Sequence, residues 1–203
     1  MQSQLLRKNA INVGFVVLAL VALAPAAGKR VFKNDRAAAD SFQSKVDLIK
    51  SNAAKSQPSQ TPIDFSQEEI NAYFSERRLK LPDGVQKVTF DLKPDQVTAF
   101  TRVDFEKLRQ SRPSMNPLLS IFDGVHDCQV VAHAESAGPG RVRVRVESVN
   151  IDGMNVPRMP LQMFVNHYVK PKYPSVDLDA EYKLPTRIDT ATIKTQQGVI
   201  VQK

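Results

Sequence analysis

The chain contains a single cysteine, Cys128, among its 203 residues. One cysteine excludes an intramolecular disulfide, so the folded chain depends on its core alone. Because Cys128 lies far from the N-terminal region, a lipidated N-terminal cysteine is also excluded. We expect Cys128 to be a buried strand residue that acts as a small apolar side chain. Pairing with another chain is the alternative.

The sequence also lacks the common catalytic signatures, since no Gly-x-Ser-x-Gly, His-Glu-x-x-His or phosphate-binding glycine loop occurs in it. His126 and Cys128 fall on one face of an expected strand, but two ligands are too few for a structural zinc site. The adjacent Glu68 and Glu69 diverge by about 100° on a helix and cannot act as a catalytic pair. We therefore predict no catalytic residue, no metal and no cofactor.

The first 26 residues contain no acid, and two basic residues precede an apolar run over 10–24 that ends at Pro25. This order is that of a secretory signal. The run is shorter than the roughly 20 residues that span a bilayer. We interpret residues 1–27 as an export signal, with an uncleaved membrane anchor as the alternative. Either places the rest of the chain in the periplasm or on the extracytoplasmic face of the membrane.

The formal charge of the whole chain is +7. Arg7 and Lys8 belong to the signal, so 7 − 2 leaves +5 for the remainder. This mild excess favours anionic surfaces such as phospholipid headgroups or nucleic acid. Export argues against nucleic acid as a partner.

Residues 28–62 are predicted to form a helical stalk followed by a Pro/Ser linker. Phe42, Val46 and Ile49 recur at helical spacing, which indicates a helix with a thin apolar stripe. The linker, 56–62, is polar and contains two prolines. Because the stripe is thin, we favour a stalk that holds the domain away from the membrane. The alternative is that the helix packs on the domain.

Residues 63–203 are predicted to form the folded domain, which opens with a helix. Ser66 and Glu69 have the spacing of a capping box, and Phe65 and Ile70 that of a hydrophobic staple. Further along, alternating patterns predict strands, and a helical pattern predicts a second helix at 156–169. The strands are expected in pairs at 85–105, 126–151 and 178–201. This order predicts an α+β fold, a curved antiparallel sheet with helices packed on one face.

Two sets of residues are candidates for binding. Bulky apolar residues gather around two irregular regions and suggest a lipid-binding groove, with ordinary core packing as the alternative. This set is Leu118, Leu119, Phe122, Met159, Met163 and Phe164. The arginine row Arg141, Arg143 and Arg145 alternates with valines and suggests a contact with lipid phosphates or an acidic partner. A solvated strand face is the alternative for this row.

Three segments resemble a family of exported bacterial proteins. They are the "acidic, acidic, Ile, Asn" helix at 63–74, the "strand, Gly, Val-Pro, helix" step at 149–157 and the closing strand pair at 184–201. These motifs resemble the LmeA-like phospholipid-binding proteins and the related YpmS-like membrane-anchored proteins over 63–201. The resemblance implies a sheet wrapped against helices, with an apolar interior open to an acyl chain. It implies no catalytic residue.

The leading hypothesis is a non-enzymatic lipid-binding or lipid-carrier protein of the bacterial envelope. Its partners would be a phospholipid or another acyl lipid and the membrane surface, with envelope proteins as further candidates. The alternative is a structural or adaptor module of an envelope assembly, recruited through a sheet edge or the helix at 29–56. A hydrolase that uses dispersed carboxylates or histidines is the least favoured reading.

Overall fold

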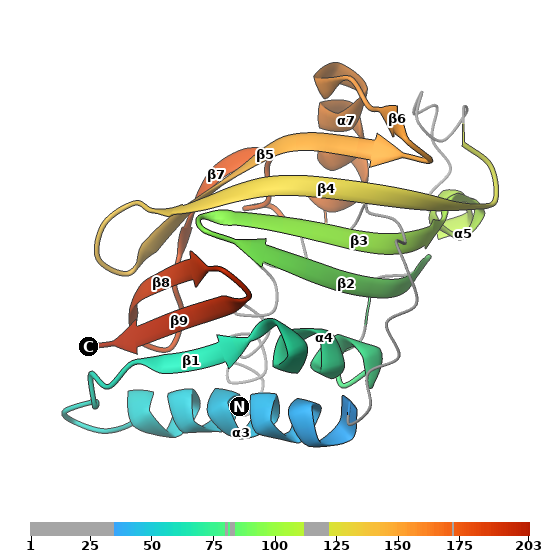
Figure 1. Ribbon diagram of the computed structural model, residues 1–203. Coiled ribbons are helices and arrows are strands. Elements are labelled where there is room, and N and C mark those ends of the chain that lie inside the picture. The colour runs from blue at the N-terminus through green and yellow to red at the C-terminus, as the bar shows by residue number, and fades with distance from the viewer. Residues whose placement is uncertain (1–34, 80, 82–83, 112–121, 172) are drawn as a thin grey trace, which may run out of the picture.

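Figure 1 shows a computed structural model of the protein, which describes residues 35–79, 81, 84–111, 122–171 and 173–203. The predicted signal at 1–27 lies outside these residues. None of the helices in the described part of the chain has the length and apolar character needed to cross a membrane.

The helices and strands follow the predicted order, but the strand pair expected at 178–201 is wrong. This segment forms three strands: the first pairs with the strand at 141–151, and the other two pair with each other. The helices are α3 (Asp35–Ala53), α4 (Gln67–Ser75), α5 (Phe105–Ser111), α7 (Arg158–Phe164) and the π-helix η1 (Val165–Val169). The strands are β1 (Ile63–Ser66), β2 (Val85–Lys93), β3 (Gln96–Asp104), β4 (Val125–Ser136), β5 (Arg141–Ile151), β6 (Met154–Asn155), β7 (Asp179–Lys183), β8 (Ile188–Lys194) and β9 (Gln197–Gln202).

The strands form two antiparallel sheets, which agrees with an α+β class. The larger sheet has the order β2-β3-β4-β5-β6, and β7 also pairs with β5. The smaller sheet has the order β1-β9-β8. The sequence analysis expected one sheet and missed β1, because it spans only four residues and ends at the helix cap Ser66. Its pairing with β9, Phe65 opposite Gly198, is a contact that local patterns do not reveal.

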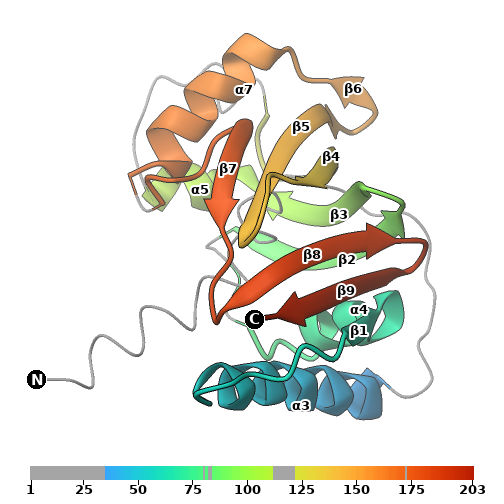
Figure 2. The same cartoon turned by 90° about the vertical axis from the view of Figure 1, so that its left-hand side faces the viewer.

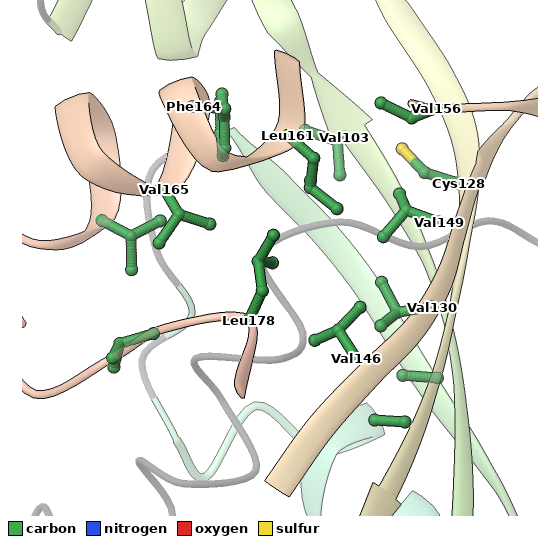
Figure 3. Close-up of a cluster of buried hydrophobic side chains, with 14 of the residues drawn as sticks. Val103, Cys128, Val130, Val146, Val149, Val156, Leu161, Phe164, Val165 and Leu178 are labelled. Atoms are coloured by element: carbon green, nitrogen blue, oxygen red, sulfur yellow. The ribbon is translucent and has the colours of Figure 1, made fainter. Parts of the chain in front are cut away.

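The main core lies between the larger sheet and the α7–η1 helix. Strand β5 alternates between buried and exposed residues, so its valines face the helix and its charged residues face solvent. Figure 3 shows Leu161 and Val165 of the helix converging with Val146 and Val149 of β5. Burying each such side chain is worth about 1.5–3 kcal/mol.

Helix α3 packs on the domain and is not the predicted free stalk. Figure 2 shows it running beneath α4 and the smaller sheet. The side chain of Ile49 is 3% exposed. The ring centroid of Phe42 lies 5.0 Å from that of Phe65 and 4.4 Å from that of Tyr73. The apolar stripe of α3 is thin because polar contacts form the rest of the interface between α3 and the domain. The spacing of apolar residues in the sequence does not reveal such contacts.

The carboxylate of Glu69 is the centre of these polar contacts. Ser66 N–H donates to Glu69 Oε2 at 2.8 Å, and Glu69 N–H donates to Ser66 Oγ at 3.1 Å, so the predicted capping box is confirmed. From α3, the Lys45 ammonium donates to both Glu69 oxygens at 2.6 and 2.8 Å, and Ser41 Oγ also donates. One carboxylate thus caps α4 and binds α3.

Side chains of α4 cover part of the free edge of β2. Asn71 Nδ2 donates to the Phe90 carbonyl at 2.9 Å, and Phe90 N–H donates to Asn71 Oδ1 at 2.7 Å. Leu92 N–H donates to Gln67 Oε1 at 2.7 Å. These amides take the place of a neighbouring strand, so this half of the edge cannot add another strand.

Replacing Glu69→Gln should destabilise the protein by about 2 kcal/mol, because hydrogen bonds to a charged group are lost at a nearly buried position. Burial opposes ionisation, but the bonds from Lys45, Ser41 and Ser66 outweigh it and lower the pKa of Glu69. The stabilisation is therefore complete above the ordinary value of 4.5 and is lost as pH falls through the lowered pKa. Urea unfolding between pH 3 and 7 measures it.

The control for Glu69 is Asp47→Asn on the exposed side of α3, where a Lys50 pair at 2.9 Å is lost. We expect a change within about 0.5 kcal/mol there. Equal losses at the two positions would contradict the role given to Glu69.

The near-isosteric change Asn71→Asp should cost about 1–3 kcal/mol, because the buried Phe90 carbonyl loses its donor. Asn166→Asp, on the exposed side of the π-helix, is the matched control and should be near neutral. Denaturant midpoints of the two variants measure the difference, and similar midpoints would rule out the edge cap.

Candidate functional site

The predicted lipid groove does not assemble from its described members. Phe122 and Phe164 are 6% and 1% exposed and belong to the main core. Met159 and Met163 lie on the outer side of α7 and are exposed. Leu118 and Leu119 lie outside the described residues. The groove prediction merged two faces of one helix, since Met159 and Met163 are about 40° apart around the axis while Phe164 is about 100° from Met163.

The exposed methionines lie apart from the core, on β6 and α7. Met154 of β6 and Met159 and Met163 of α7 are 55%, 76% and 46% exposed, and we call these three the methionine face. Only five large apolar side chains in the described part of the chain are exposed, and three of them make up this face. Figures 1 and 2 place β6 and α7 together, at the end of the molecule opposite α3.

The segment that carries the methionine face contains no acid. Residues 153–176 hold no Asp or Glu, whereas Arg158, Lys170 and Lys172 are basic. Met159 and His167 are both exposed on the helix, and Arg158 begins it. An exposed apolar face on a basic segment is typical of surfaces that contact anionic membranes.

Asp177 fixes this helix to the domain. Its carboxylate accepts hydrogen bonds from Lys170 Nζ at 2.5 Å, Gln162 Nε2 at 2.8 Å and Leu178 N–H at 2.8 Å. Burial opposes ionisation, but these donors outweigh it and lower the pKa of Asp177. The bonds from Gln162 and Lys170 tie α7 and the residue after η1 to the segment at 177–178.

The helix widens into a π turn directly after Phe164. Lys170 N–H donates to the Val165 carbonyl at 2.9 Å, five residues back. The turn places Val165, Tyr168 and Val169 in the core. Single π turns occur frequently at functional sites, and no feature of the sequence pattern predicted this one.

The arginine row is paired with acids rather than free. Arg143 donates to both Asp179 oxygens at 2.9 and 3.3 Å, and Arg141 donates to Glu181 at 3.5 Å. Arg145 lies opposite Asp179 in the ladder, and Arg143 and Arg145 both lower the pKa of Asp179. These contacts fit the alternative of a solvated strand face. The sequence did not reveal them because β5 and β7 are far apart in the chain.

The single cysteine lies in the interior of the protein. Cys128 is fully buried, as predicted, and burial raises the pKa of its thiol, so the thiol stays protonated. Among the residues that the structure describes, no three His, Cys, Asp or Glu side chains are grouped so as to hold a metal ion. Of the dispersed carboxylates, Asp127 pairs with Arg102 at 2.9 Å.

Comparison of the chain with protein-family models, with curated proteins and with solved structures finds no match. The resemblance to LmeA-like and YpmS-like proteins over 63–201 therefore stays a prediction from the motifs.

The two faces of α7 should respond differently to truncation. Phe164→Ala should cost about 3–5 kcal/mol of unfolding free energy because it leaves a cavity in the core. Met159→Ala should change it by no more than about 0.5 kcal/mol. Thermal and urea unfolding measure both. A small loss at Phe164 would mean that its ring lines an open groove.

Proposed function

We propose that the protein is a non-enzymatic lipid-binding protein of the bacterial envelope and that it contacts lipid through its methionine face. The observation that supports this is the concentration of exposed methionines on an acid-free, basic segment. Methionine side chains are flexible and polarizable, so they adapt to an irregular apolar surface such as lipid. Phospholipid or another acyl lipid at the extracytoplasmic membrane surface is the proposed partner.

The energetics suit reversible contact. Full burial of one methionine is worth about 1.5–3 kcal/mol, and a basic residue near an anionic surface about 1 kcal/mol. Met154, Met159 and Met163 with Arg158 would together hold the domain at a membrane without inserting it.

Two features argue against the adaptor alternative. The surfaces named for adaptor recruitment were a sheet edge and the helix at 29–56. Asn71 and Gln67 cover half of the β2 edge, and the apolar stripe of α3 packs on the domain. The hydrolase reading loses support because Asp177 and Asp179 are engaged with Lys170 and Arg143.

The proposed contact predicts that lipid protects the methionine face from oxidation. The full-length chain is reconstituted in vesicles of phosphatidylglycerol and phosphatidylcholine and treated briefly with hydrogen peroxide. Mass spectrometry then gives the rate of sulfoxide formation at each methionine. We expect Met154, Met159 and Met163 to oxidise about tenfold more slowly than an exposed reference, given the free energy of methionine burial.

The variant Leu48→Met supplies that reference in the same molecule. Leu48 is 51% exposed and lies on α3, at the opposite end of the domain. The protection should weaken in pure phosphatidylcholine because the basic residues lose their anionic partners. Oxidation of all four thioethers at one rate in both vesicles would contradict lipid contact by this face.

A further inference from the structure

The imidazole of His126 joins two segments that are separated in the chain. Its Nδ1 lies 2.6 Å from Oδ2 of Asp152, in the turn between β5 and β6. Its Nε2 lies 2.7 Å from the backbone carbonyl oxygen of Asp123, in the segment that precedes β4. Figure 1 shows the start of β4 beside the end of β5, where the chain turns into β6, in agreement with these contacts.

Both partners of the ring are acceptors. The Asp123 carbonyl can only accept, and a carboxylate also only accepts when it is ionised. A neutral imidazole has one N–H, so it satisfies one of these contacts and sets its second nitrogen lone pair against the other oxygen. Only the imidazolium, which has two N–H groups, donates to both.

The surroundings of the ring favour its positive charge. Burial opposes protonation, but the bonds to Asp152 and Asp123 and the charges of the same two carboxylates outweigh it and raise the pKa of His126. Two aromatic rings pack against the imidazole. The centroid of Phe105, the first residue of α5, lies 5.6 Å from that of the His126 ring, and the centroid of Phe122 lies 5.2 Å from it.

The remaining charged groups near the ring are largely paired with each other. In β4 the Asp127 carboxylate binds Arg102 of β3 at 2.9 Å. At the start of α5 the Asp104 carboxylate binds Lys107 at 3.4 Å. This leaves Asp152 as the carboxylate that contacts the imidazole directly.

Asp152 is held in an unusual backbone conformation. Its φ is +49°, in the left-handed region that is unfavourable for a residue with a side chain. Its carboxylate also accepts from Asp127 N–H at 2.9 Å, and its own N–H donates to the Asp127 carbonyl at 2.7 Å. Met154 of the methionine face is two residues further along, so the bond to His126 helps to fix where Met154 stands.

We propose that His126 is an imidazolium at neutral pH and acts as a pH-dependent clamp on the β5–β6 turn. When the ring loses its proton, one of its two hydrogen bonds and its ion pair with Asp152 are lost. The turn is then released from the segment at 122–124, and Met154 becomes more mobile. The link to lipid contact rests on the function proposed above, whereas the protonation of His126 does not.

The direction of the pH dependence follows from the raised pKa. The clamp contributes its full stabilisation below the ordinary histidine value of 6.5 and loses it as pH rises through the higher pKa of the folded protein. Alkaline pH is therefore the condition that opens the clamp.

Proton and nitrogen NMR of the histidine rings in the full-length chain tests the proposal without lipid. We expect both His126 nitrogens to be protonated at pH 7, with a titration midpoint above 6.5. Asp152→Asn should move that midpoint to lower pH because it removes the facing charge. Asp179→Asn, on the remote strand β7, is the matched control and should leave it in place.

A second readout follows the turn itself. The rate at which peroxide oxidises Met154, relative to Met163 in the same molecule, should increase as pH rises through the titration midpoint of His126. In the Asp152→Asn variant, this relative rate should already be high at neutral pH. A midpoint at or below 6.5, or one that Asp152→Asn does not move, would overturn the clamp. Neither measurement uses vesicles. The experiments can therefore contradict the clamp while lipid contact is confirmed, or contradict lipid contact while the clamp is confirmed.

Discussion

The carboxylate of Glu69 links parts of the chain that a proline-containing linker separates. It ends β1, begins α4 and receives the ammonium of Lys45 from α3. The β1 strand in turn pairs with β9, so the smaller sheet and both N-terminal helices depend on the same junction. A partly buried charge of this kind is stabilising only while all its donors are present, which makes the junction cooperative. The first described helix is therefore part of the domain.

Packing on both sides of the larger sheet determines where binding can occur. Its inner face is covered by α7 and η1, and its outer face balances the arginines of β5 with the acids of β7. Half of the free edge at β2 is closed by Asn71 and Gln67. In the part of the chain that the structure describes, three of the five exposed large apolar side chains lie on β6 and on the outer side of α7. This constraint moves the proposed lipid contact from an internal groove to an external surface.

Features set by neighbouring residues were predictable from the sequence. The capping box at Ser66, the hairpin β2–β3 and the alternation of β5 all depend on spacings of two to four residues, and all are confirmed. The features that were missed depend on distant pairs: β1 with β9, the arginines with β7, and α3 with Glu69. The described members of the candidate groove lie apart for a related reason. Apolar residues close in sequence point to opposite sides of a helix, and composition does not say which side is covered.

If lipid contacts the outside of the domain, no lipid should stay bound once the membrane is removed. Native mass spectrometry of the full-length chain, extracted from cell membranes with mild detergent, measures this. After exchange into lipid-free detergent, we expect a mass with no bound lipid. A phospholipid retained at one molecule per chain, and lost when a charge replaces Phe164 in a variant that still folds, would show that the interior is the binding site. That result would contradict the account.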